Sequence, residues 1–150
     1  LFNVLNNEYE MEGLKVLDLF GGTGAISYEF ASRGASMVYC VEMLPMHANF
    51  IKSQAQKFGM DNLTVVRHNV FEFLEICREK FDIIFLDPPY AEVFLENSLK
   101  MITEIDILQS GGIIVTEYQV GKSLDLDFLH QFQAREYKYG ITKLMVFRKV

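Results

Sequence analysis

Two short segments carry the residue types that could do chemistry. The first is Asp18-Leu19-Phe20-Gly21-Gly22-Thr23-Gly24-Ala25, and the second is Asp87-Pro88-Pro89-Tyr90. Each follows an apolar run that is typical of a buried strand. We interpret the first segment as a loop for a nucleoside cofactor and the second as a rigid clamp for a planar nitrogen. Together they predict transfer of a methyl group from S-adenosylmethionine to an amino nitrogen, with a nucleic-acid base as the preferred acceptor.

The glycines of the first segment favour a close approach of the backbone to a ligand. Gly21, Gly22 and Gly24 stand at a predicted strand-to-helix turn, where free backbone amides attract a negative group. Phe20 and Thr23 belong to the same predicted cofactor loop. Tight packing is the alternative reason for glycines at such a turn.

A site for a nicotinamide dinucleotide is disfavoured. The fingerprint G-x-G-x-x-G requires glycine at position 27, which is Ser27. The two strand-like runs at the end of the chain also differ from a plain dinucleotide-binding sheet. We therefore do not expect an NAD oxidoreductase.

Five more residues at predicted strand ends are expected to contact the cofactor. Asp18 could face the charged amino end of the methionine moiety. Glu42 could accept hydrogen bonds from ribose hydroxyls, with a solvated strand end as the alternative. Met43 could cover one face of the adenine or serve packing alone. Asn69 and the backbone amide of Val70 could contact the adenine edge, and Asn69 is also a candidate helix N-cap.

The second segment follows the fourth predicted strand, on the sheet edge where open α/β proteins bind ligands. Its two prolines fix φ and leave carbonyl groups free to accept hydrogen bonds. Asp87 and the carbonyl of Pro88 could each accept one N–H of an exocyclic amine and turn its lone pair toward the sulfonium methyl. Pro89 completes the rigid turn, and Tyr90 could stack on the base. A Pro-Pro turn capped by Asp87 is the structural alternative.

The chain alternates between strand-like and helix-like stretches. The predicted strands are Lys15–Phe20, Met37–Glu42, Leu63–His68, Asp82–Asp87, Gly112–Tyr118, Ala134–Tyr139 and Thr142–Arg148. The predicted helices are Gly24–Ser32, Met46–Phe58, Val70–Arg78, Ala91–Ile105 and Leu124–Phe132, with Gly34, Gly59 and Gly111–Gly112 marking helix ends. The alternation predicts right-handed βαβ units, and the last two strands must pair as an antiparallel hairpin.

This order of elements resembles the class I S-adenosylmethionine-dependent methyltransferase fold. We therefore predict an α/β, Rossmann-like fold. Its sheet is expected to be seven-stranded and mostly parallel, with a C-terminal antiparallel hairpin and helices on both faces.

Bulk composition predicts a single domain over residues 1–150. Half of the residues are hydrophobic and 13% are aromatic, which is enough for a packed core.

No apolar run reaches the ~18 residues that a membrane span needs, so no membrane partner is expected. The net charge of −6 argues against an extended nucleic-acid surface on these 150 residues. The basic residues of the tail form either a small phosphate-facing patch or the solvated edge of the hairpin: Arg135, Lys138, Lys143, Arg148 and Lys149.

No metal site is expected. Cys40 and Cys77 lack the spacing of metal ligands, and we predict that they are buried thiols in a reducing compartment, consistent with a cytoplasmic location. His47, His68 and His130 are too scattered to form a ligand set and are predicted to be ordinary residues.

Several motifs together identify a family resemblance. They are Leu1-Phe2-Asn3-Val4-Leu5, the loop from Asp18 to Gly24 with Glu29 and Ser32-Arg33-Gly34-Ala35 after it, and Asp87 to Tyr90. On these motifs essentially the whole chain resembles the RsmD-type methyltransferases, which methylate N2 of a guanine in 16S ribosomal RNA. The resemblance implies S-adenosylmethionine held by Asp18, the glycine loop, Glu42 and Asn69, with Asp87 to Tyr90 holding the guanine amine. It also implies ribosomal RNA or a small-subunit ribosomal particle as the partner.

The chain departs from the family pattern at some positions. Gly21 stands where alanine is frequent, a difference we expect to be harmless, and Leu44 replaces a residue that is often polar. Residue 1 is Leu, so we expect the amino end to be trimmed. The basic segment that usually precedes the first motif is absent from these 150 residues.

Other function classes remain open at this level. The same clamp serves amino methyltransferases that act on adenine N6 of DNA or on protein glutamine. A non-catalytic cofactor-binding module is a further alternative. For the leading interpretation we expect direct in-line displacement at the methyl carbon by a monomeric enzyme.

Overall fold

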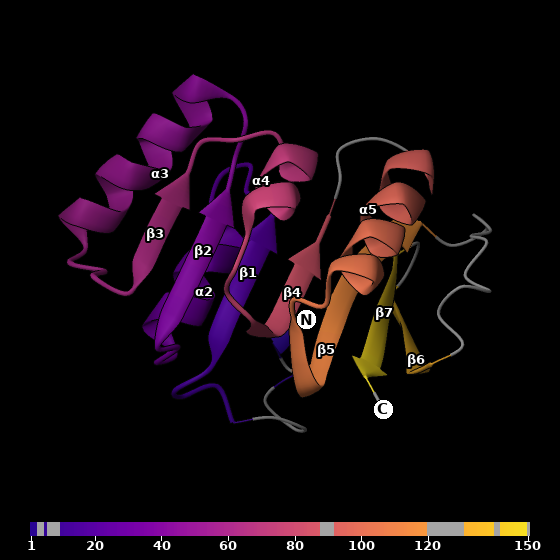
Figure 1. Cartoon of the computed structure of the whole chain (residues 1–150). Helices are drawn as coiled ribbons and strands as arrows, with labels where there is room; N and C mark the ends of the chain where they lie inside the picture. The colour runs from indigo at the N-terminus through magenta and orange to yellow at the C-terminus, as the bar shows by residue number, and fades with distance from the viewer. Residues whose placement is uncertain (3–4, 6–9, 88–91, 120–130, 140–141, 150) are drawn as a thin grey trace.

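The computed structural model describes residues 1–2, 5, 10–87, 92–119, 131–139 and 142–149. A seven-stranded sheet crosses the molecule in the order β3-β2-β1-β4-β5-β7-β6 (Figure 1). Its strands are β1 (Lys15–Leu19), β2 (Met37–Val41), β3 (Leu63–Val66), β4 (Phe81–Leu86), β5 (Leu108–Gln119), β6 (Phe132–Tyr139) and β7 (Thr142–Lys149). Neighbouring strands from β3 to β5 pair in parallel, whereas β7 is antiparallel to both β5 and β6. The predicted fold class is confirmed.

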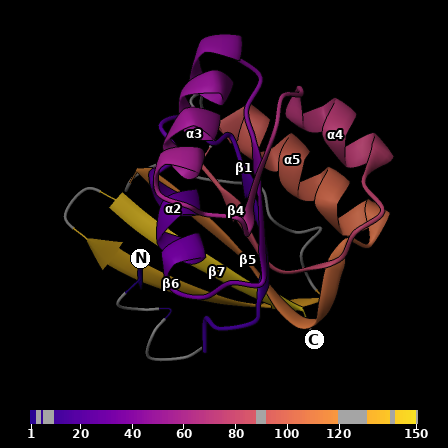
Figure 2. The same cartoon turned by 90° about the vertical axis from the view of Figure 1, so that its left-hand side faces the viewer.

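Helices cover both faces of the sheet. They are α2 (Ala25–Ser32), α3 (Pro45–Lys57), α4 (Val70–Ile76) and α5 (Glu92–Ile105). In the side view of Figure 2, α2 and α3 lie on one side of the strands, and α4 and α5 lie on the other. None of the described helices combines the length and the apolar character needed to cross a membrane.

Two hydrophobic clusters, one on each face, hold the layers together. Val16 and Ile83 point into the cluster that contains Phe30 of α2. Their neighbours in sequence point the other way, into the cluster that contains Leu74 of α4 and Leu99 of α5. Because the strands are buried on both faces, their sequences are almost continuously apolar rather than alternating.

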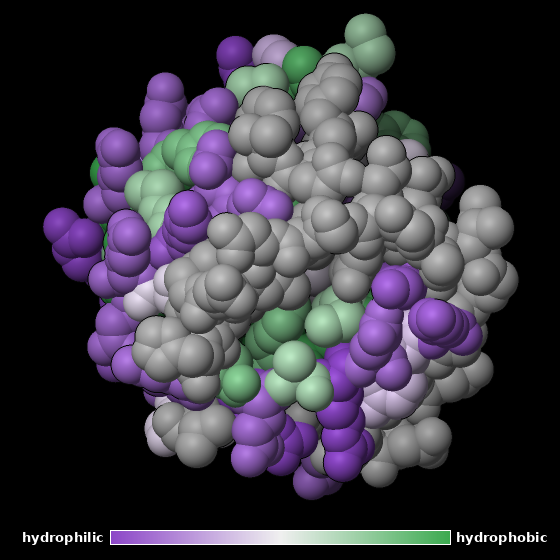
Figure 3. Space-filling view, turned by 90° about the vertical axis from the view of Figure 1, so that its right-hand side faces the viewer, coloured by the Kyte–Doolittle hydropathy of each residue, from purple (hydrophilic) through white to green (hydrophobic). Residues whose placement is uncertain are grey.

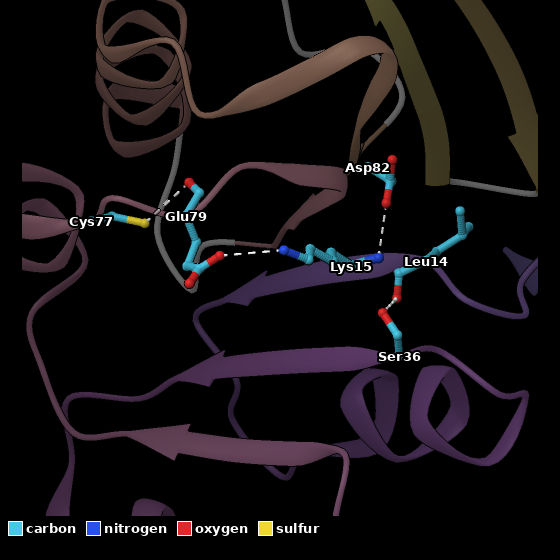
Figure 4. A network of polar contacts seen from close by, with 6 residues as sticks. All are labelled: Leu14, Lys15, Ser36, Cys77, Glu79 and Asp82. Carbon is cyan, nitrogen blue, oxygen red and sulfur yellow. Dashed lines mark hydrogen bonds and ion pairs between the residues drawn. The ribbon is translucent and has the colours of Figure 1, made fainter.

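Polar contacts fix the strands at the edge opposite the carboxyl ends of the parallel strands (Figure 4). The backbone amide of Lys15 donates a 2.9 Å hydrogen bond to Asp82 Oδ2, which ties the start of β1 to β4. The Lys15 ammonium also lies 3.4 Å from Glu79 Oε2. The Ser36 hydroxyl donates to the carbonyl of Leu14, 3.2 Å away, just before β1 and β2 begin. These contacts hold the central strands in register, so their opposite ends are held in register too.

The far end of the sheet is hydrophilic. Figure 3 shows this end, at the right of Figure 1, where hydrophilic residues border a small hydrophobic area below and to its right. β6 is the edge strand, and most of its described side chains are exposed. Two basic residues of β7 form ion pairs here, Lys143 with Glu136 at 2.7 Å and Lys149 with Asp106 at 2.8 Å. Charged side chains on an edge strand discourage pairing with another chain, so the solvated-edge interpretation is favoured.

Two expectations about the second half of the chain require correction. Gly111–Gly112 does not mark a helix end: it lies inside β5, where the register against β4 shifts between Phe81 and Ile83. Glycine suits this irregular part of the strand, because Gly111 adopts a positive φ of +76°.

The predicted helix Leu124–Phe132 is wrong at its end, since Phe132 begins β6. Residues 124–130 lie outside the described residues.

Candidate functional site

A cavity of about 710 Å³ opens at the carboxyl ends of the parallel strands, the upper edge of the sheet in Figure 1. It brings together the ends of β1, β2 and β4 with the loop before α4. Ten of the predicted site residues line it: Asp18, Phe20, Gly21, Gly22, Thr23, Glu42, Met43, Asn69, Val70 and Asp87. The predicted cofactor loop and Asp87, the first residue of the predicted clamp, therefore share one cavity although they are far apart in sequence.

The loop between β1 and α2 turns sharply through residues with positive φ. Gly22 has φ +59° and Gly24 has φ +86°, a region that glycine enters without steric cost. Phe20 has φ +59°, an uncommon conformation for a large side chain that often marks a functional site. Gly24 does not line the cavity. It is the N-terminal capping residue of α2, where an added Cβ would lie 2.9 Å from the Tyr28 ring.

Gly21 is required for a steric reason. Its φ is not positive, but a Cβ at this position would overlap the sulfur of buried Cys40. The Gly21 amide also donates a 2.9 Å hydrogen bond to the carbonyl of Val41, which pulls the loop against β2. In this chain Cys40 occupies the space that the side chain of an alanine at position 21 would need.

Glu42 is integrated into the cofactor loop. Its carboxylate accepts a hydrogen bond from the Gly22 amide at 3.0 Å and a longer one, 3.4 Å, from the Leu44 amide. The residue is only 8% exposed, so the alternative of a solvated strand end does not hold. His47 Nδ1 lies 3.7 Å from Glu42 Oε1. One carboxylate thus anchors the loop while it lines the cavity.

Asn69 is the N-terminal cap of α4, as predicted, and its contact with adenine stays a prediction. Its side-chain oxygen accepts a 2.8 Å hydrogen bond from the Phe71 amide and so caps α4. Its Nδ2 atom lies 3.8 Å from the Met43 sulfur. Because both side chains line the cavity, their contact joins the β2 and β3 sides of its wall.

Asp18 lies deep in the site. It is 2% exposed, and its Oδ2 accepts a 2.6 Å hydrogen bond from the hydroxyl of Ser27, which is fully buried. Burial raises the pKa of Asp18 to about 7, and the charges of Asp87 and Glu42 act in the same direction against the lowering effect of the Ser27 hydrogen bond. Asp18 therefore changes its charge near neutral pH, where a nearby cation would favour the charged form.

Asp87 provides the link to the clamp. The residue follows β4 directly and its side chain lines the cavity, although much of the residue is exposed. Partial burial raises the pKa of its carboxyl. Pro88, Pro89 and Tyr90 lie outside the described residues, so their predicted roles stay predictions.

Several residues of the site are not marked by any motif in the sequence. Ser27 stands where a dinucleotide fingerprint would need glycine, and its position on α2 directs its hydroxyl at Asp18. His47 was predicted to be ordinary, yet it lines the cavity beside Glu42, as do apolar residues such as Leu44 and Phe85. No local pattern marks these residues, because their positions depend on how α2 and α3 dock on the sheet. Among the described residues, no three His, Cys, Asp or Glu side chains are grouped as metal ligands.

Comparison with known proteins gives consistent matches. Residues 1–148 match the model of the family described as Conserved hypothetical protein 95. A Ribosomal RNA small subunit methyltransferase D from Buchnera aphidicola (subsp. Baizongia pistaciae) is 31% identical over 119 residues, covering 79% of this chain and 60% of that protein. The putative rRNA methyltransferase YlbH from Bacillus subtilis is 28% identical over 153 residues, covering 99% of this chain and 82% of its own length.

Solved structures share the fold along the whole chain. The putative methyltransferase yhhF from Escherichia coli superposes with a TM-score of 0.87 at 24% identity, covering 99% of this chain and 82% of that one. A conserved hypothetical protein from Streptococcus pyogenes superposes with a TM-score of 0.86 at 25% identity, covering 99% and 92%. The matched segment of the Buchnera relative is thus less than two thirds of that protein, whereas the structural matches extend over most of both chains.

Proposed function

The chain belongs to the family described as Conserved hypothetical protein 95, the RsmD-type methyltransferases, and on this basis we propose that it transfers a methyl group from S-adenosylmethionine to the N2 amine of a guanine in 16S ribosomal RNA. One observation carries the proposal. The acidic residue that opens the clamp, Asp87, lines the same cavity as the cofactor-loop residues Asp18 and Glu42. A transfer reaction needs donor and acceptor in contact, so a shared cavity is its first requirement.

The lining of the cavity suits a nucleoside with a cationic side chain. Glu42 offers a fixed carboxylate to ribose hydroxyls, since the Gly22 amide already holds one of its oxygens. Asn69 and the Val70 amide offer hydrogen bonds to the adenine edge, beside Met43. Asp18 offers a carboxylate toward the amino end of the methionine moiety. S-adenosylmethionine supplies an electrophilic methyl carbon on its sulfonium.

Asp87 orients and activates the acceptor nitrogen. The amine of guanine is a poor nucleophile, because its lone pair is delocalised into the ring. A carboxylate that accepts one N–H turns the lone pair toward the methyl carbon and stabilises the positive charge that develops on nitrogen. With the cofactor bound, the new C–N bond would form as the C–S bond broke, and the electron pair of that bond would stay on sulfur. The nitrogen then loses one proton, and the raised pKa of Asp87 makes its carboxylate a suitable acceptor.

The substrate is expected to be RNA rather than DNA or protein. The support is the family and the relatives named for ribosomal RNA methylation. The base must leave its stack to enter the cavity, at a cost of a few kcal/mol. Cytoplasmic location, action as a monomer and recognition of a small-subunit particle belong to the same proposal.

The test is incubation with methyl-labelled S-adenosylmethionine and three acceptors: small-subunit particles from cells that lack this methylation, DNA, and a glutamine-containing protein substrate. We expect label on ribosomal RNA in the particles. Label confined to DNA adenine or to protein glutamine would reject the RNA assignment. Cofactor binding without any transfer would instead support a non-catalytic module.

A further inference from the structure

A second carboxylate lies next to Asp87 on the neighbouring strand. In the register of β4 against β5, Leu86 pairs with Thr116, so the next step along both strands brings Asp87 beside Glu117. Adjacent strands lie about 4.8 Å apart, and paired residues present their side chains on the same face. Burial, and then the charge of Asp87, raise the pKa of Glu117, as the strand register leads one to expect for neighbouring carboxyl groups.

The pair continues a row of acidic residues along the carboxyl edge of the sheet. Asp18 pairs with Phe85, and Phe85 pairs with Val115. Because side chains alternate between faces, Asp87 and Glu117, each two residues further on, share the face of Asp18. The strand order then places Asp18 on β1, Asp87 directly after β4 and Glu117 on β5.

Glu117 lies on the acceptor side of this row. Asp18 and Asp87 both line the cofactor cavity, whereas Glu117 does not. Its position is therefore beyond Asp87, on the side away from the glycine loop. A base whose amine is held by Asp87 would extend its ring toward β5, since the methyl donor occupies the β1 side.

The Glu117 carboxylate also lacks a hydrogen-bond donor among the described residues. It is partly buried, and no hydrogen bond or ion pair to it forms within the part of the chain that the structure describes. Burial, and then the charge of Asp87, raise its pKa. A desolvated carboxylate without donors is costly, and N–H groups of a ligand would relieve that cost.

We infer that Glu117 is a specificity residue that accepts the N1–H of the acceptor guanine while Asp87 holds its N2 amine. The inference rests on the proposed function. Guanine presents two adjacent N–H donors on its Watson–Crick edge, and a pair of neighbouring carboxylates is complementary to them. Adenine presents a lone pair at N1 instead, so Glu117 would repel it. The same carboxylate therefore selects guanine over adenine and fixes which edge enters the site.

The test uses an analogue that keeps the amine and changes only N1. First, the methylated guanine in the small-subunit particle is mapped with the unmodified protein. Particles are then reconstituted with 2-aminopurine at that position, a base that has the N2 amine but an unprotonated N1. Rates are measured for the unmodified protein, for Glu117→Gln and for Glu104→Gln, which removes an exposed carboxylate on α5. Cofactor affinity and the unfolding temperature are measured for each variant.

The unmodified protein is expected to prefer guanine to 2-aminopurine by roughly 10- to 100-fold, the discrimination typical of a well-placed hydrogen-bonding pair. In Glu117→Gln the rate on guanine should fall at least about tenfold and the preference should approach one, because an amide can donate to the bare N1. Cofactor affinity should be unchanged, and Glu104→Gln should behave as the unmodified protein.

Equal loss on both bases, or no loss on either, would overturn the role of Glu117. If Glu117→Gln fails to fold, Glu117→Asp replaces it. This variant keeps the carboxylate, so it should keep the preference for guanine over 2-aminopurine. Loss of that preference would overturn the inference. Absence of N2-methylguanine with the unmodified protein would be a separate result, since it would reject the proposed function itself.

Discussion

The hydroxyl of Ser27 donates a 2.6 Å hydrogen bond to Asp18 Oδ2, and both residues are buried. This contact joins the first turn of α2 to the end of β1, beneath the glycine loop. It opposes the effect of burial on the pKa of Asp18, which nevertheless rises to about 7. The charge of Asp18, at the base of the cavity, therefore depends on its burial and on the hydrogen bond from Ser27.

Ser27→Ala should weaken cofactor binding in a pH-dependent way. Loss of the hydrogen bond raises the pKa of Asp18 further, so less of the anion remains at pH 7 to attract the cationic donor. We expect affinity for S-adenosylmethionine to fall roughly tenfold at pH 7 and to recover in part at pH 9. Titration calorimetry measures the affinity for S-adenosylmethionine between pH 7 and pH 9. Ser32→Ala, on the exposed face of α2, is the matched control. A loss that is constant with pH would contradict the link to Asp18.

Asp18→Asn should change how stability depends on pH. The pKa of Asp18 is raised from 3.8 to about 7 in the folded protein, so the folded state binds the proton more tightly than the unfolded chain. The contribution of this group to stability is therefore highest below pH 4 and falls as pH rises from about 4 to 7. Above pH 7 it is lower by on the order of 4 kcal/mol than below pH 4.

The asparagine variant removes that titration. Its free energy of unfolding, measured in denaturant without cofactor, should fall less than that of the unmodified protein between pH 4 and 7. Parallel curves for the two proteins would show that Asp18 keeps an ordinary pKa.

Gly21→Ala should destabilise the protein through Cys40. A methyl group at position 21 would overlap the buried Cys40 sulfur, and overpacking of this kind costs about 1–3 kcal/mol. Cys40→Ala in the same chain should restore part of the loss, because it vacates that space. Cys77→Ala, at the end of α4, should not. Chemical denaturation of the three single variants and of the two double variants that contain Gly21→Ala measures the coupling, and additive effects of Gly21→Ala and Cys40→Ala would contradict the steric explanation.

Glu42→Gln should affect binding more than turnover. Glutamine keeps one acceptor for the Gly22 amide but loses the charge and the second acceptor for ribose hydroxyls. We expect about tenfold weaker binding of S-adenosylmethionine, with the maximal rate at saturating cofactor nearly unchanged. Glu75→Gln, an exposed position on α4, is the control. A maximal rate that falls as much as the affinity would place Glu42 closer to the reacting atoms than proposed.

The parts of the fold that were predictable depend on local chemistry. Apolar runs followed by glycine or by Asp-Pro-Pro marked the ends of β1 and β4, and the ligand-binding edge of an α/β sheet follows from those ends. Asn69 was predictable as a cap because a cap depends only on the residues just after it. Glu42 was predictable as a strand-end carboxylate, although its burial was not.

Features that arise from packing between distant segments were not predictable. Ser27 reaches Asp18 only because α2 docks on β1, and Cys40 excludes a side chain at position 21 only because β2 lies beside the loop. The Gly111–Gly112 pair looked like a helix end because glycine serves both purposes, and only the pairing of β4 with β5 shows the irregular strand. The roles of Pro88, Pro89 and Tyr90 stay predictions.

The most direct measurement is the identity of the methylated nucleoside made by the unmodified protein and by Asp87→Ala. Small-subunit ribosomal RNA is digested after reaction with saturating S-adenosylmethionine, and the nucleosides are analysed by mass spectrometry, while cofactor affinity is measured on both proteins. The account predicts N2-methylguanosine from the unmodified protein, at least about a hundredfold less from Asp87→Ala, and similar cofactor affinity for the two. A different methylated nucleoside, or full activity without the Asp87 carboxylate, would contradict it.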